Sequence, residues 1–198
     1  MKKLIICAIL YFLVLTLFAQ PVTLAPDSLT KKSIIKIEFF SPLTGNTTFG
    51  YERYLKNFTS IEAKSGIIGL GKKIGDYRDS GMFLKIGPKF KLKPEYATDG
   101  TFGTHLLRGS YIRPEIGLAI FDHQEVFSSS KTITSATILI NYGNQYILGD
   151  IMSLDWHIGL GYGFSSDDDQ GYYYGYSAGD SEFPMSISSG FTLGILLK

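Results

Sequence analysis

The stretch SGFTLGILL, residues 189–197, decides the fold of this chain. Its large apolar residues recur at every second position and so share one face of an extended strand: Phe191, Leu193, Ile195 and Leu197. Gly190 and Gly194 fall on the opposite face. A strand of this kind at the end of a sequence is typical of the strand that closes a β-barrel. We therefore predict a terminal assembly strand that includes Gly190, Phe191, Leu193 and Ile195.

The same period of two recurs from Ser33 onward, between clusters of Gly, Asn, Asp and Ser. Eight strands are expected, over residues 33–41, 47–55, 58–68, 81–92, 108–121, 131–142, 146–164 and 185–198. Lys56-Asn57 and Gly143–Gln145 are predicted as tight turns. Residues 93–107 and 165–184 are predicted as long connections.

An export signal precedes the strands. Lys2 and Lys3 are followed by an apolar run, Leu4–Phe18, and by the small residue Ala19. This order is that of a secretory signal peptide. The run is shorter than the ~20 apolar residues of a spanning helix, which weighs against a membrane anchor. The predicted organisation is a signal peptide, a short periplasmic segment and one barrel domain: residues 1–19, 20–32 and 33–198.

Composition limits the classes of function. The 19 Lys and Arg residues nearly balance the 18 Asp and Glu residues, so nothing suggests a nucleic-acid partner. The single cysteine, Cys7, lies in the predicted signal peptide, which leaves the mature chain without disulfide or thiol chemistry. The 22 Gly, 13 Tyr and 14 Phe residues favour many strands around a narrow lumen.

The width of that lumen decides which strand faces point inward. An eight-stranded barrel cannot hold the large apolar residues of all its strands, whereas Gly159, Gly161, Gly163 and the charged residues fit. The large apolar residues then face lipid. The predicted fold class is an all-β, eight-stranded, antiparallel, up-and-down transmembrane β-barrel. A soluble periplasmic, lipocalin-like barrel that binds lipid inside is the alternative.

Four segments resemble a family of small Gram-negative outer-membrane barrels of unknown function: SPLTGNTTFGYERYL, GSYIRPEIGLAIF, DWHIGLGYGF and SGFTLGILLK. The family carries a tyrosine-glutamate-arginine step on an early strand and a basic-proline-glutamate step on a middle strand. Residues 51–53 and 113–115 match these steps. The resemblance spans Lys36 to Lys198 and implies an architecture like the OmpA transmembrane domain and the adhesin-like OmpX. It brings no catalytic residues, and the ending Leu197-Lys198 departs from the aromatic end of many such barrels.

Charged residues on the inward faces are predicted to form a network in the lumen: Lys36, Glu38, Glu52, Glu62, Lys64, Lys85, Lys89, Arg113 and Glu115. Both signs are present, so the charges can pair across strands. The network is interpreted as a structural plug, and a gated, charge-lined pore is the alternative interpretation.

No catalytic or metal site is predicted. Ser153, Asp155 and His157 alternate on one strand face, but residues two apart on a strand are ~6.5 Å apart, too far for direct hydrogen bonding. The acidic residues of the 165–184 connection lack the spacing of a calcium-binding loop. We predict no cofactor.

The 165–184 connection is predicted to form a surface contact loop, because exposed tyrosines are good contact residues. Its candidate residues are Asp167, Asp168, Asp169, Tyr172, Tyr173, Tyr174 and Tyr176.

The sequence thus predicts a non-enzymatic outer-membrane barrel with a structural or surface-interaction role. The expected partners are outer-membrane lipid, the barrel-assembly machinery and an extracellular ligand or surface. A small-solute channel is the alternative function within the same fold.

Overall fold

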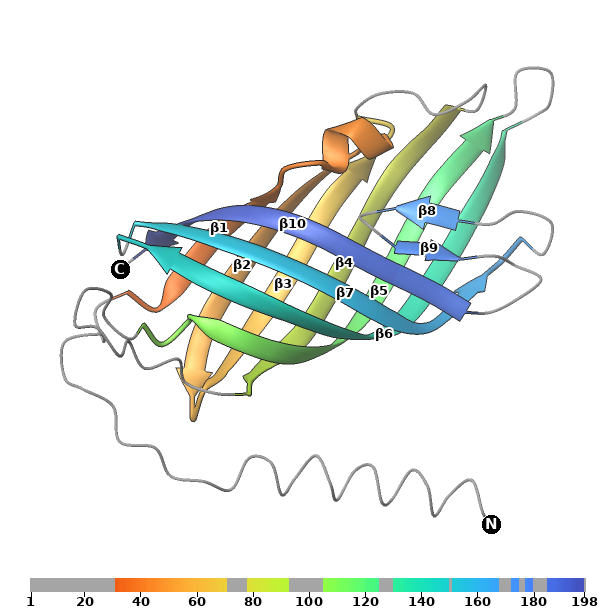
Figure 1. The fold of residues 1–198 in the computed structure, drawn as a ribbon. Coiled ribbons are helices and arrows are strands. Elements are labelled where there is room, and N and C mark those ends of the chain that lie inside the picture. Colours follow the sequence, from red (N-terminus) through yellow and green to blue (C-terminus); the bar gives the residue numbers. More distant parts are fainter. Residues whose placement is uncertain are drawn as a thin grey trace, which may run out of the picture.

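The computed structural model describes residues 31–70, 78–92, 105–124, 130–149, 151–167, 172–174, 177–179 and 185–197. Eight strands follow one another around a closed antiparallel barrel, in which the last strand pairs with the first (Figure 1). They are β1 (Ser33–Glu38), β2 (Asn46–Lys56), β3 (Thr59–Ile68), β4 (Arg78–Lys91), β5 (Gly109–Gln124), β6 (Lys131–Leu148), β7 (Met152–Ser165) and β10 (Met185–Leu197). A 3-10 helix, η2 (Ser41–Thr44), joins β1 to β2.

The predicted all-β, eight-stranded antiparallel meander is confirmed. Several predictions lie outside the described residues: the signal peptide, residues 20–30 of the segment that follows it, and residues 93–104 of the long connection. The 165–184 connection contains a short hairpin that the sequence did not predict, β8 (Tyr172–Tyr174) and β9 (Ser177–Gly179), of which β9 pairs with β10. None of the described helices is long and apolar enough to span a membrane.

The predicted turn at Gly143–Gln145 is wrong. β6 continues through these residues, and the chain turns instead after Leu148, where Gly149 has a φ of 57°. Gly143 serves packing: a Cβ there would lie 2.5 Å from the Tyr111 hydroxyl and 2.4 Å from the Trp156 carbonyl. A glycine between strand residues therefore marked a crowded place inside the barrel.

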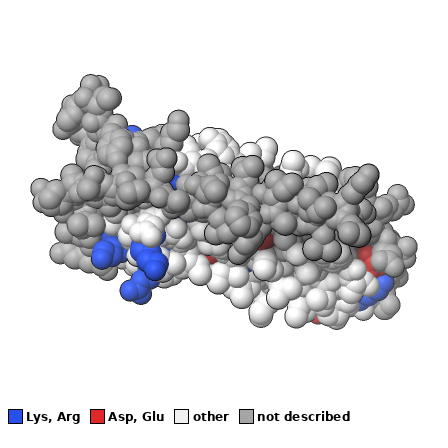
Figure 2. Space-filling model, turned by 90° about the horizontal axis from the view of Figure 1, so that it is seen from below, with Lys and Arg blue, Asp and Glu red and all other residues white. Residues whose placement is uncertain are grey.

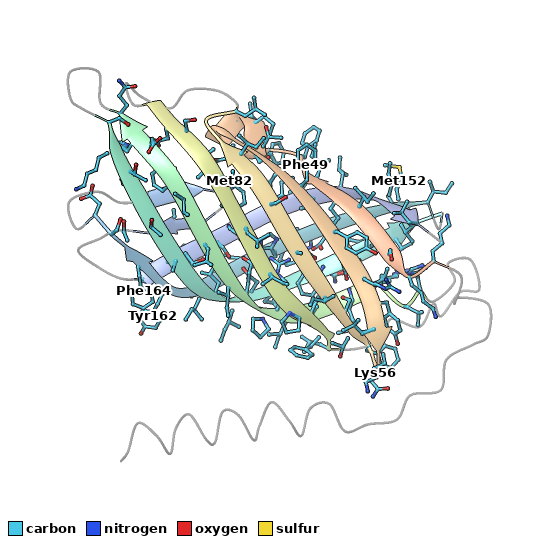
Figure 3. The ribbon with its side chains drawn as sticks, turned by 180° about the vertical axis from the view of Figure 1, so that it is seen from behind. Phe49, Lys56, Met82, Met152, Tyr162 and Phe164 are labelled. Carbon is cyan, nitrogen blue, oxygen red and sulfur yellow. The ribbon has the colours of Figure 1, made fainter. Side chains whose placement is uncertain are left out.

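The two faces of the wall differ sharply. Side chains that point outward are large and apolar, as Figure 3 shows for Phe49, Met82, Tyr162 and Phe164, and Met82 is 70% exposed. Most side chains that point inward are charged, polar or small, and Arg113 and Glu52 are 0% exposed. Where Figure 2 shows described residues of the wall, most are uncharged. This is the inverse of a water-soluble barrel.

Most buried apolar residues of the described part form two clusters, one near each end of the lumen, while Leu106, Tyr111 and Leu139 are buried outside both clusters. We call the end where β1 starts and β10 finishes the terminal end, and the opposite end the distal end. The terminal cluster consists of Ile34, Leu107, Ile147 and Leu196, with Tyr54 packed against it. The distal cluster consists of Ile68, Phe83, Ala119, Phe121 and Ile133. The charged residues lie between them.

The wall has one defect between β4 and β5. The register pairs Ile86 with Ile116 and Phe90 with Ile112, which places Pro88 opposite Pro114, and the ladder is interrupted between these pairs. The ladders from β3 to β4 and from β5 to β6 are continuous at both prolines. The two prolines therefore turn their missing N–H groups toward the same interface, and two ladder hydrogen bonds are absent there.

Restoring these donors should strengthen the wall. We expect the double substitution Pro88→Val and Pro114→Val to raise the free energy of unfolding by about 1 kcal/mol, because regained backbone hydrogen bonds outweigh the lost rigidity of proline in the unfolded chain. Urea unfolding, followed by the fluorescence of the single tryptophan Trp156, measures the change. Ile116→Val on the same outward face is the matched control, and a double variant no more stable than that control would contradict the expectation.

Candidate functional site

The inward charges converge in the middle of the lumen. All nine charged residues predicted for the lumen are at most 4% exposed. Two further charged residues, Lys91 and Asp155, join them. The eleven side chains come from β1, β2, β3, β4, β5 and β7, so they approach one another from opposite sides of the barrel.

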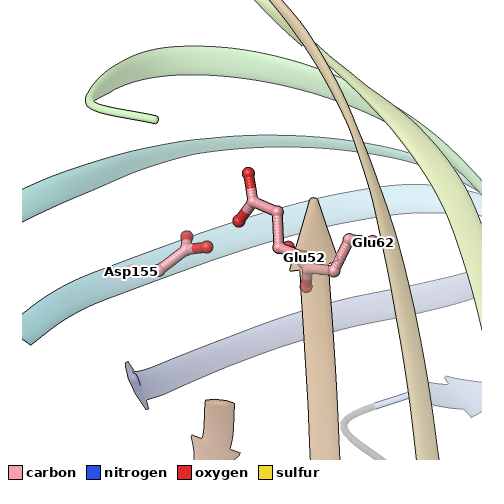
Figure 4. Close-up of side chains that lie close together, drawn as sticks. All are labelled: Glu52, Glu62 and Asp155. Carbon is pink, nitrogen blue, oxygen red and sulfur yellow. The ribbon is translucent and has the colours of Figure 1, made fainter. Parts of the chain in front are cut away.

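Two ammonium groups and three carboxylates form what we call the central cluster: Lys36, Lys89, Glu52, Glu62 and Asp155. Lys36 Nζ lies 2.5 Å from Glu52 Oε2, 2.8 Å from Glu62 Oε2 and 2.8 Å from Asp155 Oδ2. Lys89 Nζ lies 3.0, 2.7 and 2.7 Å from the same three atoms. Each ammonium thus contacts all three carboxylates. Figure 4 shows the three acidic side chains converging from β2, β3 and β7.

Neutral groups complete the hydrogen bonding of the central cluster. Gln145 Oε1 accepts from Lys36 Nζ at 2.9 Å and from Lys89 Nζ at 2.8 Å. The Tyr111 hydroxyl donates to Asp155 Oδ1 at 2.7 Å, and its ring lies 4.1 Å from Lys89 Nζ. Ser60 Oγ donates to Glu52 Oε1 at 2.6 Å. Buried charges are tolerated when their remaining hydrogen-bonding capacity is satisfied in this way.

A chain of ion pairs extends from the central cluster toward the distal end. Arg113 donates from Nη1 to Glu62 Oε1 at 2.7 Å, and its Nη2 lies 2.9 Å from Glu115 Oε2. Lys64 Nζ lies 2.7 Å from Glu38 Oε1 and 3.6 Å from Glu62 Oε1. These contacts connect β1, β3 and β5 across the lumen.

The three clustered carboxylates raise the question of a metal. Glu52, Glu62 and Asp155 offer oxygen atoms within 4.8 Å of one another. Lys36 and Lys89 already bridge these oxygens, so a cation would have to displace two ammonium groups that satisfy them. The arrangement is that of an ion-pair network.

Asp155 does not form a hydrogen-bonded catalytic arrangement with Ser153 and His157, its neighbours on the same strand face. Its carboxylate is bonded to Tyr111 and to the two lysines of the central cluster. Within the described part of the chain, no protein group bonds to Ser153 Oγ or to His157 Nδ1. Sequence reasoning placed Asp155 on the inward face but did not connect it with Lys36 and Lys89, because the contact depends on how far opposite strands are staggered.

The remaining candidate residues are dispersed. Asp167 is buried and lies 2.9 Å from Lys131 Nζ. Tyr172, Tyr173 and Tyr174 form β8, while Asp168, Asp169 and Tyr176 lie outside the described residues. On the terminal assembly strand Ile195 is exposed, Gly190, Phe191 and Leu193 are half-buried, and Gly190 faces the ring of His157.

No protein-family model, no curated protein and no solved structure matches the chain. The resemblance noted in the sequence therefore rests on its motifs alone. The eight-stranded antiparallel barrel that it implied is confirmed by the fold.

Removing one ammonium from the central cluster should destabilise the protein strongly. We expect Lys89→Met to lower the free energy of unfolding by about 3 kcal/mol, because three buried carboxylates lose a shared partner. Adding Glu52→Gln should recover part of the loss, since one uncompensated charge is then removed. Urea unfolding of both variants measures the difference.

The control for this prediction is Lys131→Met, which breaks the ion pair to Asp167 at the distal end of the barrel. The Lys131 side chain is 59% exposed, and we expect a loss below about 1 kcal/mol. Equal losses in Lys89→Met and Lys131→Met would show that the central cluster contributes no more than a single ion pair made by an exposed lysine.

Proposed function

We propose that the protein is an outer-membrane β-barrel without enzymatic activity, which spans the lipid and has a structural or surface-interaction role. The observation that carries the proposal is the belt of exposed apolar side chains around a charged lumen. Large apolar residues on every long strand are about half exposed or more, among them Ile35, Met82, Ile116, Ile140 and Leu160. Such a surface is stable in lipid and unfavourable in water.

The positions of charged residues along the outer wall also support a barrel that spans the lipid. The exposed charged residues of the strands lie near the ends, with Arg53 and Lys56 at the terminal end and Asp122 and Lys131 at the distal end. Between these positions the outward residues are apolar or small. The predicted signal peptide supports export, and the terminal assembly strand is the segment we propose for the barrel-assembly machinery.

The soluble lipid-binding alternative is less well supported. A lipocalin-like barrel needs an apolar interior for its ligand, whereas this lumen contains six basic and five acidic side chains between the two apolar clusters. The alternative would also leave the apolar belt in contact with water.

The channel alternative is opposed by three obstructions in series. The distal cluster places Phe83 and Phe121 in the lumen, the central cluster fills the middle, and Leu107 enters from the connection between β4 and β5 at the terminal end. Leu107 is 0% exposed, and its carbonyl accepts a hydrogen bond from Lys91 Nζ at 2.6 Å. A surface role is then left to the distal connections, of which the β8–β9 hairpin carries three consecutive tyrosines.

Contact with lipid can be tested directly with Trp156, the only tryptophan, which faces outward and is 38% exposed. In vesicles made with brominated acyl chains its fluorescence should fall well below that in unbrominated vesicles, because bromine quenches only at contact. The folded protein should also change electrophoretic mobility on boiling. Recovery from cells in the soluble periplasmic fraction, with unquenched Trp156, would contradict the proposed membrane location.

The closure of the terminal end can be tested by thiol labelling. The predicted mature chain has no cysteine, so Ser153→Cys introduces a single thiol into the lumen, where Ser153 is 1% exposed. We expect a small methanethiosulfonate reagent to label it slowly, and at least about tenfold faster when Leu107→Ser removes the buried apolar contact. Ile116→Ser is the control, and equal labelling rates in all three backgrounds would show that Leu107 does not close this end.

A further inference from the structure

The barrel wall is interrupted where β10 passes from one partner to another. β1 pairs with β10 from Leu197 to Thr192, and its last backbone bond runs from Phe39 N to Phe191 O at 3.1 Å. β9 pairs with Ser186–Ser188. Ser189 and Gly190 belong to neither ladder, so the described wall has a short gap beside them.

This gap lies within the apolar belt. On the other edge of β10, Phe191 is paired with Trp156, Ser189 with Ile158 and Ile187 with Leu160. Ile158 and Leu160 are both exposed on the outer face. Ile158 lies beside the gap, and Leu160 lies beyond it toward the distal end. Under the proposed membrane location, the gap would lie at the depth of the lipid chains. Irregular backbone at this depth is found where it lines a polar interior or a site.

Aromatic side chains surround the gap on the outside. β1 ends at Glu38, and the chain turns away into η2 with Phe39 56% and Phe40 44% exposed. The Phe40 ring lies 5.1 Å from that of Phe39 and 5.9 Å from that of Phe191, measured between centroids. Phe40 and Phe191 thus meet across the seam between β1 and β10. An alkyl chain or the face of a sugar ring can pack on such rings.

Polar side chains lie directly behind this aromatic rim. The register places Thr192 opposite Glu38 on one side. On the other side the last pair of the ladder is Ile37 with Phe49, and Thr48 is the neighbour of Phe49 on β2. Glu38, Thr48 and Thr192 are all buried at 2% exposure or less. Within the described part of the chain, no protein group bonds to Glu38 Oε2, Thr48 Oγ1 or Thr192 Oγ1. His157, next to Gly190 in the register, has an unbonded Nδ1 as well.

We propose that this seam binds an amphiphile with an uncharged, hydroxyl-bearing head group, whose head reaches Glu38, Thr48 and Thr192 while its alkyl chain lies along Phe39, Phe40 and Phe191. Lys64 Nζ already neutralises Glu38 through Oε1, so the free Oε2 needs a hydrogen-bond donor and not a second cation. The threonine hydroxyls both donate and accept, which matches a sugar or glycerol head. An anionic head would meet the Glu38 carboxylate.

The proposal rests on the proposed membrane location in one respect, because the membrane would be the natural source of the ligand. Binding itself can be tested in detergent solution. Native mass spectrometry of the protein in lauryldimethylamine oxide, a detergent without hydroxyl groups, would count bound molecules of dodecyl maltoside, with dodecylphosphocholine as a probe of equal chain length. We expect one saturable dodecyl maltoside and weaker binding of dodecylphosphocholine. The double variant Thr48→Val and Thr192→Val should bind at least about tenfold more weakly, since two hydrogen bonds are lost.

The matched control is Thr137→Val. Its hydroxyl is also buried and unbonded to described protein groups, but it lies on β6 beside Gly117. Boiling-dependent mobility would confirm that every variant is folded. Equal affinity of the wild type and the double variant, or an equal loss in Thr137→Val, would overturn the proposed site. Quenching of Trp156 by brominated lipid is independent of these residues, so failure of the site and failure of the membrane location give different results.

Discussion

Two lysine ammonium groups shared among three buried carboxylates are the interaction on which the rest of this structure depends. Lys36, Lys89, Glu52, Glu62 and Asp155 come from five strands that are not all neighbours in the sheet. Backbone ladders connect each strand only to the next one, whereas these contacts connect β1, β2 and β3 to β7 through the lumen. Because a buried charge without a partner costs several kcal/mol, the network also penalises any stagger of the strands that separates its members.

The inverted distribution of residues follows from this interior. A lumen filled by paired charges and by small residues such as Gly159 leaves little room for large apolar side chains, and most of these are placed on the outside. Apolar residues of the lumen gather mainly beyond the charges, at Phe83 and Phe121 in the distal cluster and at Leu107 in the terminal cluster. Leu139, opposite Glu115, is an exception among the charges. The lumen is therefore layered along its axis, with a charged middle between two apolar ends.

The alternation of residues was sufficient to predict eight strands and the inward direction of all nine lumen charges, because side chains on a strand alternate strictly between two faces. Partners were not predictable, since the pairing of Asp155 with Lys36 depends on stagger around a closed sheet. Gly143 misled the turn prediction because glycine marks both turns and crowded strand positions. The entry of Leu107 into the lumen had no signal, as two consecutive leucines, Leu106 and Leu107, at the end of a polar connection show no periodicity.

The two irregularities of the wall have different physical origins. Between β4 and β5 the strands stay adjacent and only two hydrogen bonds are missing, because Pro88 and Pro114 face each other. Beside Ser189 and Gly190 the strands themselves diverge: β1 is short, η2 leaves the wall, and the Ser41 hydroxyl takes over part of the ladder by accepting from Thr48 N at 3.1 Å. The first defect needs no ligand, since Gly87 lets the Pro114 carbonyl approach closely. The second leaves a buried carboxylate oxygen and two hydroxyls without protein partners in the described wall, which is why binding is proposed there and not at the prolines.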